Sequence, residues 1–475
     1  MGKMRIPLGG GGEDFDSKRS RQELINLIPE SNKGGEYKSV RMADGLTLYS
    51  TLTLGPVRSN IIVNGSLMYL VAGTNFVSVN KAGTETIIGA VGGTGRAQMA
   101  QNAAPAGNQI AILNGSGSGY IYTVGGALTP ITDPDFFSSS SVTVLNERFW
   151  FVRDGTNEFF GSEISDGLSY NPLTFASAEE SPDDAVAIVA RKSALWVIGS
   201  RTMEFWQSTT DTTLPLRRVN GGTYDRGIAS VDSLSETGEY FAFLADDGTV
   251  RLALDNQVRK ISDLELELKI KGNGTLTSPG FNKIDDAVGF FVDGPVHKIY
   301  YLTFPDSGYT WGYDLTTGIS LQRQTEGQGT WRAAESALFD NKRIIGDLQT
   351  GDLWKLDPNS ITENGATLRT TISTPSISLD HDATIAFIEV DMEVATTTDP
   401  AADPKMRVSY SKDGGNKFIN WGPIELGKIG AYRQRVVMRN FGRLVRHKDF
   451  ILKFEVTDPV RVQYYGLYAD VQAGF

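Results

Sequence analysis

The sequence predicts an all-β protein, a β-propeller of six or seven blades followed by a C-terminal β-sandwich. Three observations predict this class. Glycine makes up 52 of the 475 residues and accompanies many Thr, Ser, Val, Ile and Tyr, a composition of turns and strands. Candidate hairpins begin roughly every 40 to 50 residues, the length of a four-stranded blade. The pattern changes after about Ile361, where alternating strands of another texture begin.

Residues 1–60 are expected to form an N-terminal arm and closing segment. They contain a glycine run from Gly9 to Gly12 and a helix-capable stretch from Ser20 to Leu27, which the residues IPESNKGG end.

Residues 61–360 are expected to form the propeller. In SALWVIGSRTMEFWQ we expect two strands joined by a turn at Gly199 and Ser200, with Trp196, Phe205 and Trp206 as large packing groups. Further hairpins are expected at SLMYLVAG, NQIAILNG, SVTVLNERFWFV, EYFAFLADDG, AVGFFVDGPVHKIYYL and ALFDNKRIIGD.

Two segments of the propeller region carry local signals of their own. In FAFLADDGTVRLAL, Asp247 and Gly248 supply a hairpin turn with positive φ. The segment ISDLELELKI, residues 261–270, is the best helix candidate, but its alternation of leucine with charge fits a half-exposed strand equally well. Both interpretations stay open at this point.

Residues 361–475 are expected to form the sandwich. A polar, proline-punctuated break at TTTDPAADP precedes four strand-like stretches, MRVSYSKDGG, RQRVVMRNFG, DFILKFEVTDP and VRVQYYGLYADV. Alternating strands with tight turns are typical of a β-sandwich.

The composition argues against several classes of function. The 45 Lys and Arg against 56 Asp and Glu give a net charge of −11, which does not suit a general nucleic-acid binder. With no cysteine and three histidines far apart in sequence, the usual parts of zinc sites and thiol catalysis are missing. No long apolar span or signal segment is present, so we expect a soluble protein made in the cytoplasm, with no membrane anchor.

Several motifs resemble chemical sites but favour structural roles. SYSKDGGNKF is close to an Asp-box hairpin, with Ser411, Asp413 and Gly415 in place, and such a box ties a turn. GAVGGTGRAQ at 89–98 and NGSGSGY at 114–120 miss the spacing of phosphate loops and favour hairpin turns. The pairs Asp183–Asp184 and Asp285–Asp286 lack the spacing of a calcium loop. We therefore predict no catalytic, cofactor-binding or metal-binding residue.

One charge pattern differs from the acidic background. The stretch RQRVVMRNFGRLVRHK contains five arginines and one lysine with no acidic residue between them. Arginine offers fixed forks for carboxylates and stacks on rings, as interfaces use it, whereas a solvated strand would serve equally well with lysine. An interface and a plain surface remain open, with DNA phosphate contact a weaker third reading. The candidate subunit or partner interface consists of Arg433, Arg435, Arg439, Arg443 and Arg446.

The stretch at 174–230 resembles the tail hub proteins of short-tailed bacteriophages, often called packaged DNA stabilisation proteins. The features are an entry AEESPDD, a strand ending in Gly199 and Ser200, the strand MEFWQ and a closing turn at Gly227 and Ile228. SYSKDGG, LGKIGAYRQRVVMRNFGRLV and FEVTDPV are similar to the terminal domain of the same class. The resemblance covers about half of the chain, and none of its motifs is catalytic.

The resemblance implies a structural virion protein of the tail, not an enzyme. It implies a homo-oligomeric ring, a hexamer, that forms below the portal and its adaptor ring and closes the DNA channel. Tailspikes or fibres and a tail needle or plug would attach to it, and packaged DNA would lie in the lumen without sequence-specific binding. No cofactor is implied.

The alternative is a tail-associated carbohydrate-binding or glycoside-cleaving propeller. It draws on the single Asp-box-like hairpin and on tryptophans that could lie at the surface, namely Trp150, Trp206, Trp311, Trp331, Trp354 and Trp421. A cytoplasmic WD-type scaffold would need recurrent Gly-His and Trp-Asp pairs, which this sequence lacks.

Overall fold

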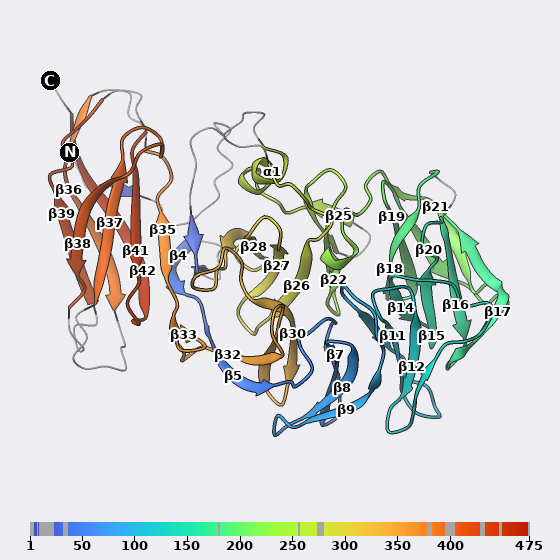
Figure 1. The fold of residues 1–475 in the computed structure, drawn as a ribbon. Coiled ribbons are helices and arrows are strands. Elements are labelled where there is room, and N and C mark those ends of the chain that lie inside the picture. Colours follow the sequence, from blue (N-terminus) through green and yellow to red (C-terminus); the bar gives the residue numbers. More distant parts are fainter. Residues whose placement is uncertain are drawn as a thin grey trace.

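A computed structural model describes residues 4–6, 8, 23–31, 37–178, 181–254, 257–272, 280–377, 382–394, 404–427, 433–445 and 449–473. A propeller occupies one end of the molecule and a sandwich the other (Figure 1). The predicted fold class, a propeller followed by a C-terminal sandwich, is confirmed. Among the described residues no helix is long and apolar enough to cross a membrane.

The propeller contains, in the described residues, seven groups of four antiparallel strands, the blades. Blade 1 is β6 (Ile62–Asn64), β7 (Leu67–Ala72), β8 (Asn75–Asn80) and β9 (Glu85–Ala90). Blade 2 is β10 (Gln98–Gln101), β11 (Gln109–Leu113), β12 (Gly119–Thr123) and β13 (Leu128–Pro130). Blade 3 is β14 (Val142–Leu145), β15 (Arg148–Val152), β16 (Glu158–Glu163) and β17 (Asp166–Ser177). Blade 4 is β18 (Ala185–Arg191), β19 (Ala194–Gly199), β20 (Met203–Ser208) and β21 (Leu216–Tyr224).

The remaining blades include one strand from the beginning of the chain. Blade 5 is β22 (Ser235–Glu236), β23 (Tyr240–Leu244), β24 (Val250–Leu254) and β25 (Gln257–Lys260), preceded by the short 3-10 helix η1 (Val231–Ser233). Blade 6 is β26 (Val288–Asp293), β27 (Lys298–Phe304), β28 (Tyr309–Asp314) and β29 (Ile319–Gln322). Blade 7 is β30 (Ala333–Phe339), β31 (Lys342–Asp347), β32 (Asp352–Asp357) and β5 (Gly45–Thr51), with β33 (Thr362–Glu363) and β34 (Ala366–Thr367) beside it.

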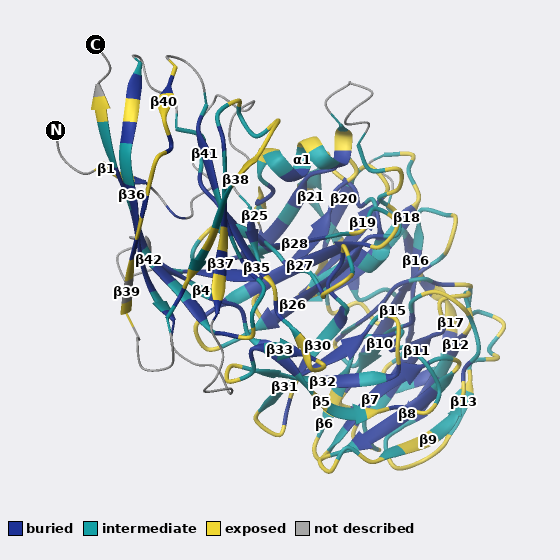
Figure 2. Ribbon diagram, turned by 60° about the vertical axis from the view of Figure 1, so that its left-hand side comes forward, coloured by how far each residue is buried: buried dark blue, intermediate teal, exposed yellow. Residues whose placement is uncertain are grey.

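Strand β5 closes the ring of blades. It pairs with β32, which lies some 300 residues later in the chain, with Leu356 opposite Leu46. Blade 7 then packs on blade 1 through an apolar cluster that includes Leu52, Met68 and Phe339. Comparable apolar clusters fill all of the remaining junctions between neighbouring blades. The blade interiors are therefore buried (Figure 2).

The hairpins expected in the propeller are present. Gly199 turns between β19 and β20 by donating from its N–H to the carbonyl of Thr202 at 2.7 Å, and Gly248 has φ of 73° between β23 and β24. The rings of Trp196 and Phe205 pack 5.1 Å apart. The open segment 261–270 forms helix α1 (Leu264–Lys271), capped by Asp263, whose carboxylate accepts from the N–H of Leu266.

Two sheets make up the sandwich. The first sheet contains β3 (Leu27–Ser31), β4 (Tyr37–Met42), β42 (Val462–Ala473), β36 (Ala383–Val394) and β39 (Arg433–Arg439), with β1 (Met4–Ile6) on β42 and β40 (Arg443–Leu444) on β36. The second contains β35 (Thr370–Ser373), β41 (Ile451–Val456), β37 (Lys405–Ser411) and β38 (Ile419–Glu425). Ile388 and Tyr464 of the first sheet belong to one buried core with Met406 and Phe454 of the second.

A single short strand joins the two domains. Strand β2 (Leu24–Ile25) pairs in parallel with β29 of blade 6 and antiparallel with β35 of the sandwich. One nine-stranded sheet therefore runs from blade 6 into the sandwich. The hydrogen-bonded sheet is therefore continuous across the boundary between the two domains.

The segment expected to be an arm supplies strands to both domains in its described part: β1, β3 and β4 to the sandwich, β5 to blade 7 and β2 between them. The helix prediction for Ser20 to Leu27 is wrong in the described residues, because Leu24 and Leu27 are buried in strands. Strand β3 pairs with the neighbouring β4, whereas β1, β2, β4 and β5 have partners far along the chain that hairpin spacing could not reveal.

Candidate partner interface

The arginine stretch lies on an edge strand of the sandwich. β39 ends the path of its sheet and has β36 as its neighbour. Arg433, Arg435 and Arg439 are exposed, whereas the alternate residues Val436 and Met438 are buried. The three arginines share one face because side chains alternate along a strand. Arg443 is also exposed and lies on β40 nearby, and Arg446 lies outside the described residues.

Three of these arginines bind carboxylates of the same chain. Arg433 donates two hydrogen bonds to Asp391, Nη2 to Oδ2 at 2.7 Å and Nε to Oδ1 at 3.1 Å. Arg435 lies 3.7 Å from Glu389, and Arg443 pairs with Asp382. The hydrogen bonds from Arg433 lower the pKa of Asp391.

The arginines therefore cover acidic groups beneath them. Asp391 and Glu389 are 8% and 7% exposed, while the side chains of Arg433 and Arg435 are 69% and 70% exposed. The outermost layer of this face is guanidinium. We name Arg433, Arg435, Arg439 and Arg443 the basic edge.

Arg439 differs from the other members of the basic edge. In the described part of the chain its guanidinium has no carboxylate partner, although its carbonyl accepts a hydrogen bond from Trp421 Nε1 at 2.8 Å. Val437, on the same face, is 43% exposed. The edge thus offers one arginine and one apolar side chain that its own fold leaves available.

The Asp-box-like hairpin is a turn, as expected. Ser411 donates its hydroxyl to Asp413 Oδ1 at 2.7 Å and accepts from the N–H of Gly415 at 2.9 Å. Asp413 also accepts from the N–H of Lys417 at 3.0 Å. These bonds close the connection between β37 and β38, and they lower the pKa of Asp413.

The glycine-rich loops serve the propeller. The segment 91–97 is the connection from blade 1 to blade 2, so the hairpin expected there is wrong. The carbonyl oxygens of its glycines face the side chain of Arg58. Arg58 donates to the carbonyl oxygens of Gly95 at 2.6 Å and Gly92 at 3.1 Å. A loop that presents carbonyls to arginine has the wrong polarity for phosphate. The segment 114–118 is the expected hairpin, between β11 and β12.

The acidic pairs also hold turns. Asp183 accepts hydrogen bonds from the N–H groups of Arg201 and Thr202 at 2.8 and 3.0 Å. Asp286 accepts from the N–H of Asp306 at 2.9 Å. Among the residues that the structure describes, no group of three or more His, Asp or Glu side chains could hold a metal ion.

The tryptophans offer little surface for stacking on sugars. Five of the six that the carbohydrate alternative invoked are buried, and Trp421 is partly buried against the sandwich core. The buried five are Trp150, Trp206, Trp311, Trp331 and Trp354. The alternative loses this support.

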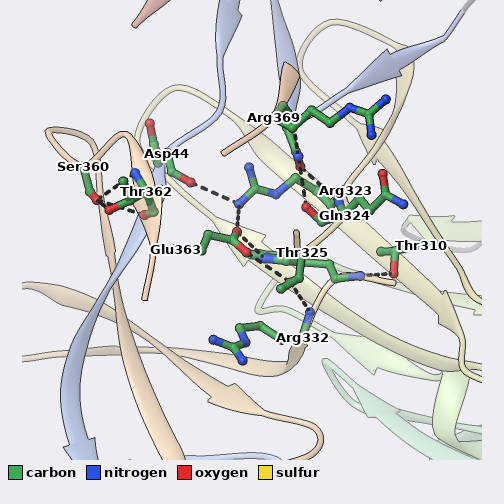
Figure 3. A network of polar contacts seen from close by, with 12 residues as sticks. Asp44, Thr310, Arg323, Gln324, Thr325, Arg332, Ser360, Thr362, Glu363 and Arg369 are labelled. Carbon is green, nitrogen blue, oxygen red and sulfur yellow. Dashed lines mark hydrogen bonds and ion pairs between the residues drawn. The ribbon is translucent and has the colours of Figure 1, made fainter. Parts of the chain in front are cut away.

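A buried polar network at the domain junction was not predicted from the sequence. Glu363, which is 3% exposed, accepts hydrogen bonds from Arg323 at 3.0 Å, Trp331 Nε1 at 3.0 Å and Thr325 at 3.1 Å (Figure 3). Arg323 also donates to the carbonyl of Asp44 at 3.0 Å. Burial raises the pKa of Glu363, and Arg323 opposes that rise.

Asn26 extends the same junction. Its amide donates to the carbonyls of Gln324 at 2.9 Å and Arg369 at 2.8 Å, and its carbonyl oxygen accepts from the N–H of Gln324 at 3.0 Å. With φ of 55°, Asn26 turns the chain from β2 into β3. The side chain of Asn26 therefore links the N-terminal segment both to the end of blade 6 and to the connection into the sandwich.

These features define a class of protein, a closed propeller joined by a continuous sheet to a β-sandwich that carries a basic edge. The chain belongs to the bacteriophage P22 Gp10 family: the model of its β-propeller matches residues 4–361, and the model of its β-sandwich matches residues 371–472. It is thus a member of a phage stabilisation protein family. A search of curated protein sequences found no match.

Solved structures match the chain with low similarity. The computationally designed Ika8 protein is 12% identical with a TM-score of 0.43, covering 65% of this chain and 99% of its own. A streptogramin B lyase is 10% identical with a TM-score of 0.45, covering 66% and 97%. BamB from Moraxella catarrhalis is 9% identical with a TM-score of 0.39, covering 75% and 96%.

Proposed function

We propose that this chain is a structural virion protein that forms a ring-shaped tail hub below the portal and adaptor. The ring, a hexamer, closes the DNA channel to retain the packaged genome. It anchors tailspikes or fibres and a needle or plug. The observation that carries this proposal is membership in the P22 Gp10 family along both domains.

Two properties of the molecule support this role. A hub must transmit force between its attachment sites, and the nine-stranded sheet that runs from blade 6 into the sandwich is a continuous hydrogen-bonded path between the two domains. A channel wall should not hold DNA, and the net charge of −11 repels it. We expect the free chain to be monomeric or weakly associated and to close into a ring on its partner.

The role can be tested on filled heads that lack this protein. We expect such heads to lose DNA, and added purified protein to restore both nuclease resistance and the capacity to bind tail parts. The variant Arg259→Glu, a charge change at an exposed residue of β25, serves as a positive control and should restore retention equally. Heads that retain DNA without the protein, or that do not bind it, would contradict the proposal.

The proposal includes the absence of enzymatic activity. We expect purified protein to release no reducing sugar from O-antigen polysaccharide, sialosides or peptidoglycan. Release that disappears when a single blade-surface acid is changed would overturn this part.

A further inference from the structure

Blade 3 has a small pocket on its outer edge. A cavity of about 140 Å³ lies between β16, β17 and the segment that precedes β14, with Phe160 and Tyr170 among its lining residues. Phe137 and Phe175 also line it, and Arg153 lies over the Phe137 ring at 4.0 Å while binding Glu158 at 2.6 Å. The pocket therefore already accommodates a guanidinium against an aromatic face.

Exposed apolar side chains surround this pocket. Leu173 is 64% exposed and Phe175 is 45% exposed, both on β17, the last strand of its sheet. Asp135, which also lines the pocket, has no carboxylate hydrogen bond or ion pair within the described ranges. An apolar edge beside an available carboxylate fits a protein partner that brings an arginine.

The charges of blade 3 and of the basic edge are opposite. Residues 131–178 contain seven acidic residues and two arginines, and residues 433–445 contain four arginines and no acidic residue. The two surfaces also lie at opposite ends of the molecule, with the first sheet of the sandwich at one end and β17 at the other in both views (Figures 1 and 2). A ring built from identical chains needs two different, complementary surfaces of this kind.

We propose that the basic edge of one copy docks on the blade 3 pocket of the next, with Arg439 as the anchoring side chain. Arg439 is chosen because Arg433, Arg435 and Arg443 already bind carboxylates of their own chain. Its guanidinium meets Asp135 and the exposed ring of Phe175, while Arg153 stays on the Phe137 ring. Val437 meets the apolar edge around Leu173. This inference rests on the proposed ring and identifies its subunit contact.

The natural sequence contains no cysteine, so a thiol-specific cross-linker reacts only with cysteines that are introduced. The variant with both Asn440→Cys and Thr132→Cys, exposed residues close in sequence to Arg439 and Asp135, keeps the proposed pair in place. It is assembled on adaptor-bearing heads and treated with a short bis-maleimide. We expect a ladder of linked chains that ends at the ring size. A mixture of the two single-cysteine variants should stop at linked pairs, because each chain then carries one reactive end.

Charge exchange provides a second readout. Arg439→Asp alone and Asp135→Arg alone should each reduce ring assembly by at least about tenfold, and the two changes in one chain should restore it. Arg259→Asp is the control, and thermal midpoints of all variants should match that of the unmodified chain. A ring that forms without linking or rescue overturns this contact while the hub role stands. An unmodified chain that forms no ring on heads overturns the hub role and this contact with it.

Discussion

Two arginine–carboxylate pairs of this chain have similar contact distances and opposite surroundings. Arg323 lies 3.0 Å from Glu363 with side chains 1% and 3% exposed, and Arg433 lies 2.7 Å from Asp391 with side chains 69% and 11% exposed. The exposed pair is the shorter one, yet water competes for its arginine. Distance therefore does not rank the two contacts, whereas burial does, because a buried charge that loses its partner cannot turn to solvent.

The comparison also separates two tasks. The buried pair joins the connection that follows blade 6 to β33 beside blade 7. The exposed pair keeps acidic groups of β36 satisfied while leaving the basic edge accessible to another chain. Four substitutions test this difference between buried and exposed ion pairs.

The largest effect is expected at the junction. Glu363→Ala leaves Arg323 buried without a carboxylate and should lower the free energy of unfolding by about 3–5 kcal/mol. Urea denaturation followed by tryptophan fluorescence measures this loss. The matched control is Glu326→Ala. Glu326 is exposed and follows the last strand of blade 6, so its removal should change the free energy of unfolding little. Equal effects of the two variants would contradict the role of burial.

A pair of intermediate exposure should show the opposite effect: removing the charge of its carboxylate should raise the stability of the folded chain at high pH. Arg96 and Glu335 lie 3.6 Å apart with side chains 13% and 14% exposed, and burial raises the pKa of Glu335 to about 7 from 4.5. The folded chain holds this proton in a pH range where the unfolded chain has released it, so stability falls as pH rises through that range.

Glu335→Gln removes this dependence. The variant should unfold like the unmodified chain near about pH 4 and be more stable at about pH 8, by at most about 3 kcal/mol. Thermal melts at the two pH values give the comparison. A variant that is less stable at the higher pH would show that the pairing with Arg96 outweighs burial.

A smaller loss is expected for the side chain of Asn26. Asn26→Ala removes three hydrogen bonds at the junction and places alanine at positive φ, so we expect a loss of about 1–3 kcal/mol. Asn26→Gly removes the same bonds but tolerates the backbone conformation. The difference between the two variants in chemical denaturation isolates the backbone part. If glycine restores full stability, the side-chain bonds contribute nothing.

The smallest effect is expected at the exposed pair. Arg433→Gln should lower the thermal midpoint only slightly at neutral pH. Arg433 lowers the pKa of Asp391, so its contribution is present above the ordinary carboxyl pKa of 3.8 and disappears as the pH falls below it. Melts at about pH 6 and about pH 3 should therefore show a difference that shrinks at the lower value. A drop as large as that of Glu363→Ala would contradict the comparison.

The same contrast explains what the sequence could predict. The basic edge was visible because its arginines are neighbours in the chain, and strand alternation correctly placed Arg433 and Arg435 on one face. Their pairing with Asp391 and Glu389 was not visible, because those carboxylates lie on β36, earlier in the chain. Hairpin spacing and turn residues such as Gly248 predicted the blades for the same local reason.

The junction could not be predicted. Asn26, Asp44, Arg323 and Glu363 come from segments that only the folded chain brings together. Neither β5 nor β2 has a partner nearby in sequence, so a closing strand and a linking strand looked like an irregular arm. The helix at 264–271 was undecided because alternation and helical capping both fit its residues, and the Asp263 cap decided it.

A cryo-electron microscopy reconstruction of the filled particle would show whether this chain forms the tail hub. We expect density for the propeller and sandwich to form a closed ring directly below the portal and adaptor, with the sandwich of each copy against blade 3 of the next. Density for this chain elsewhere on the particle, or as isolated copies that leave the DNA channel open, would contradict it.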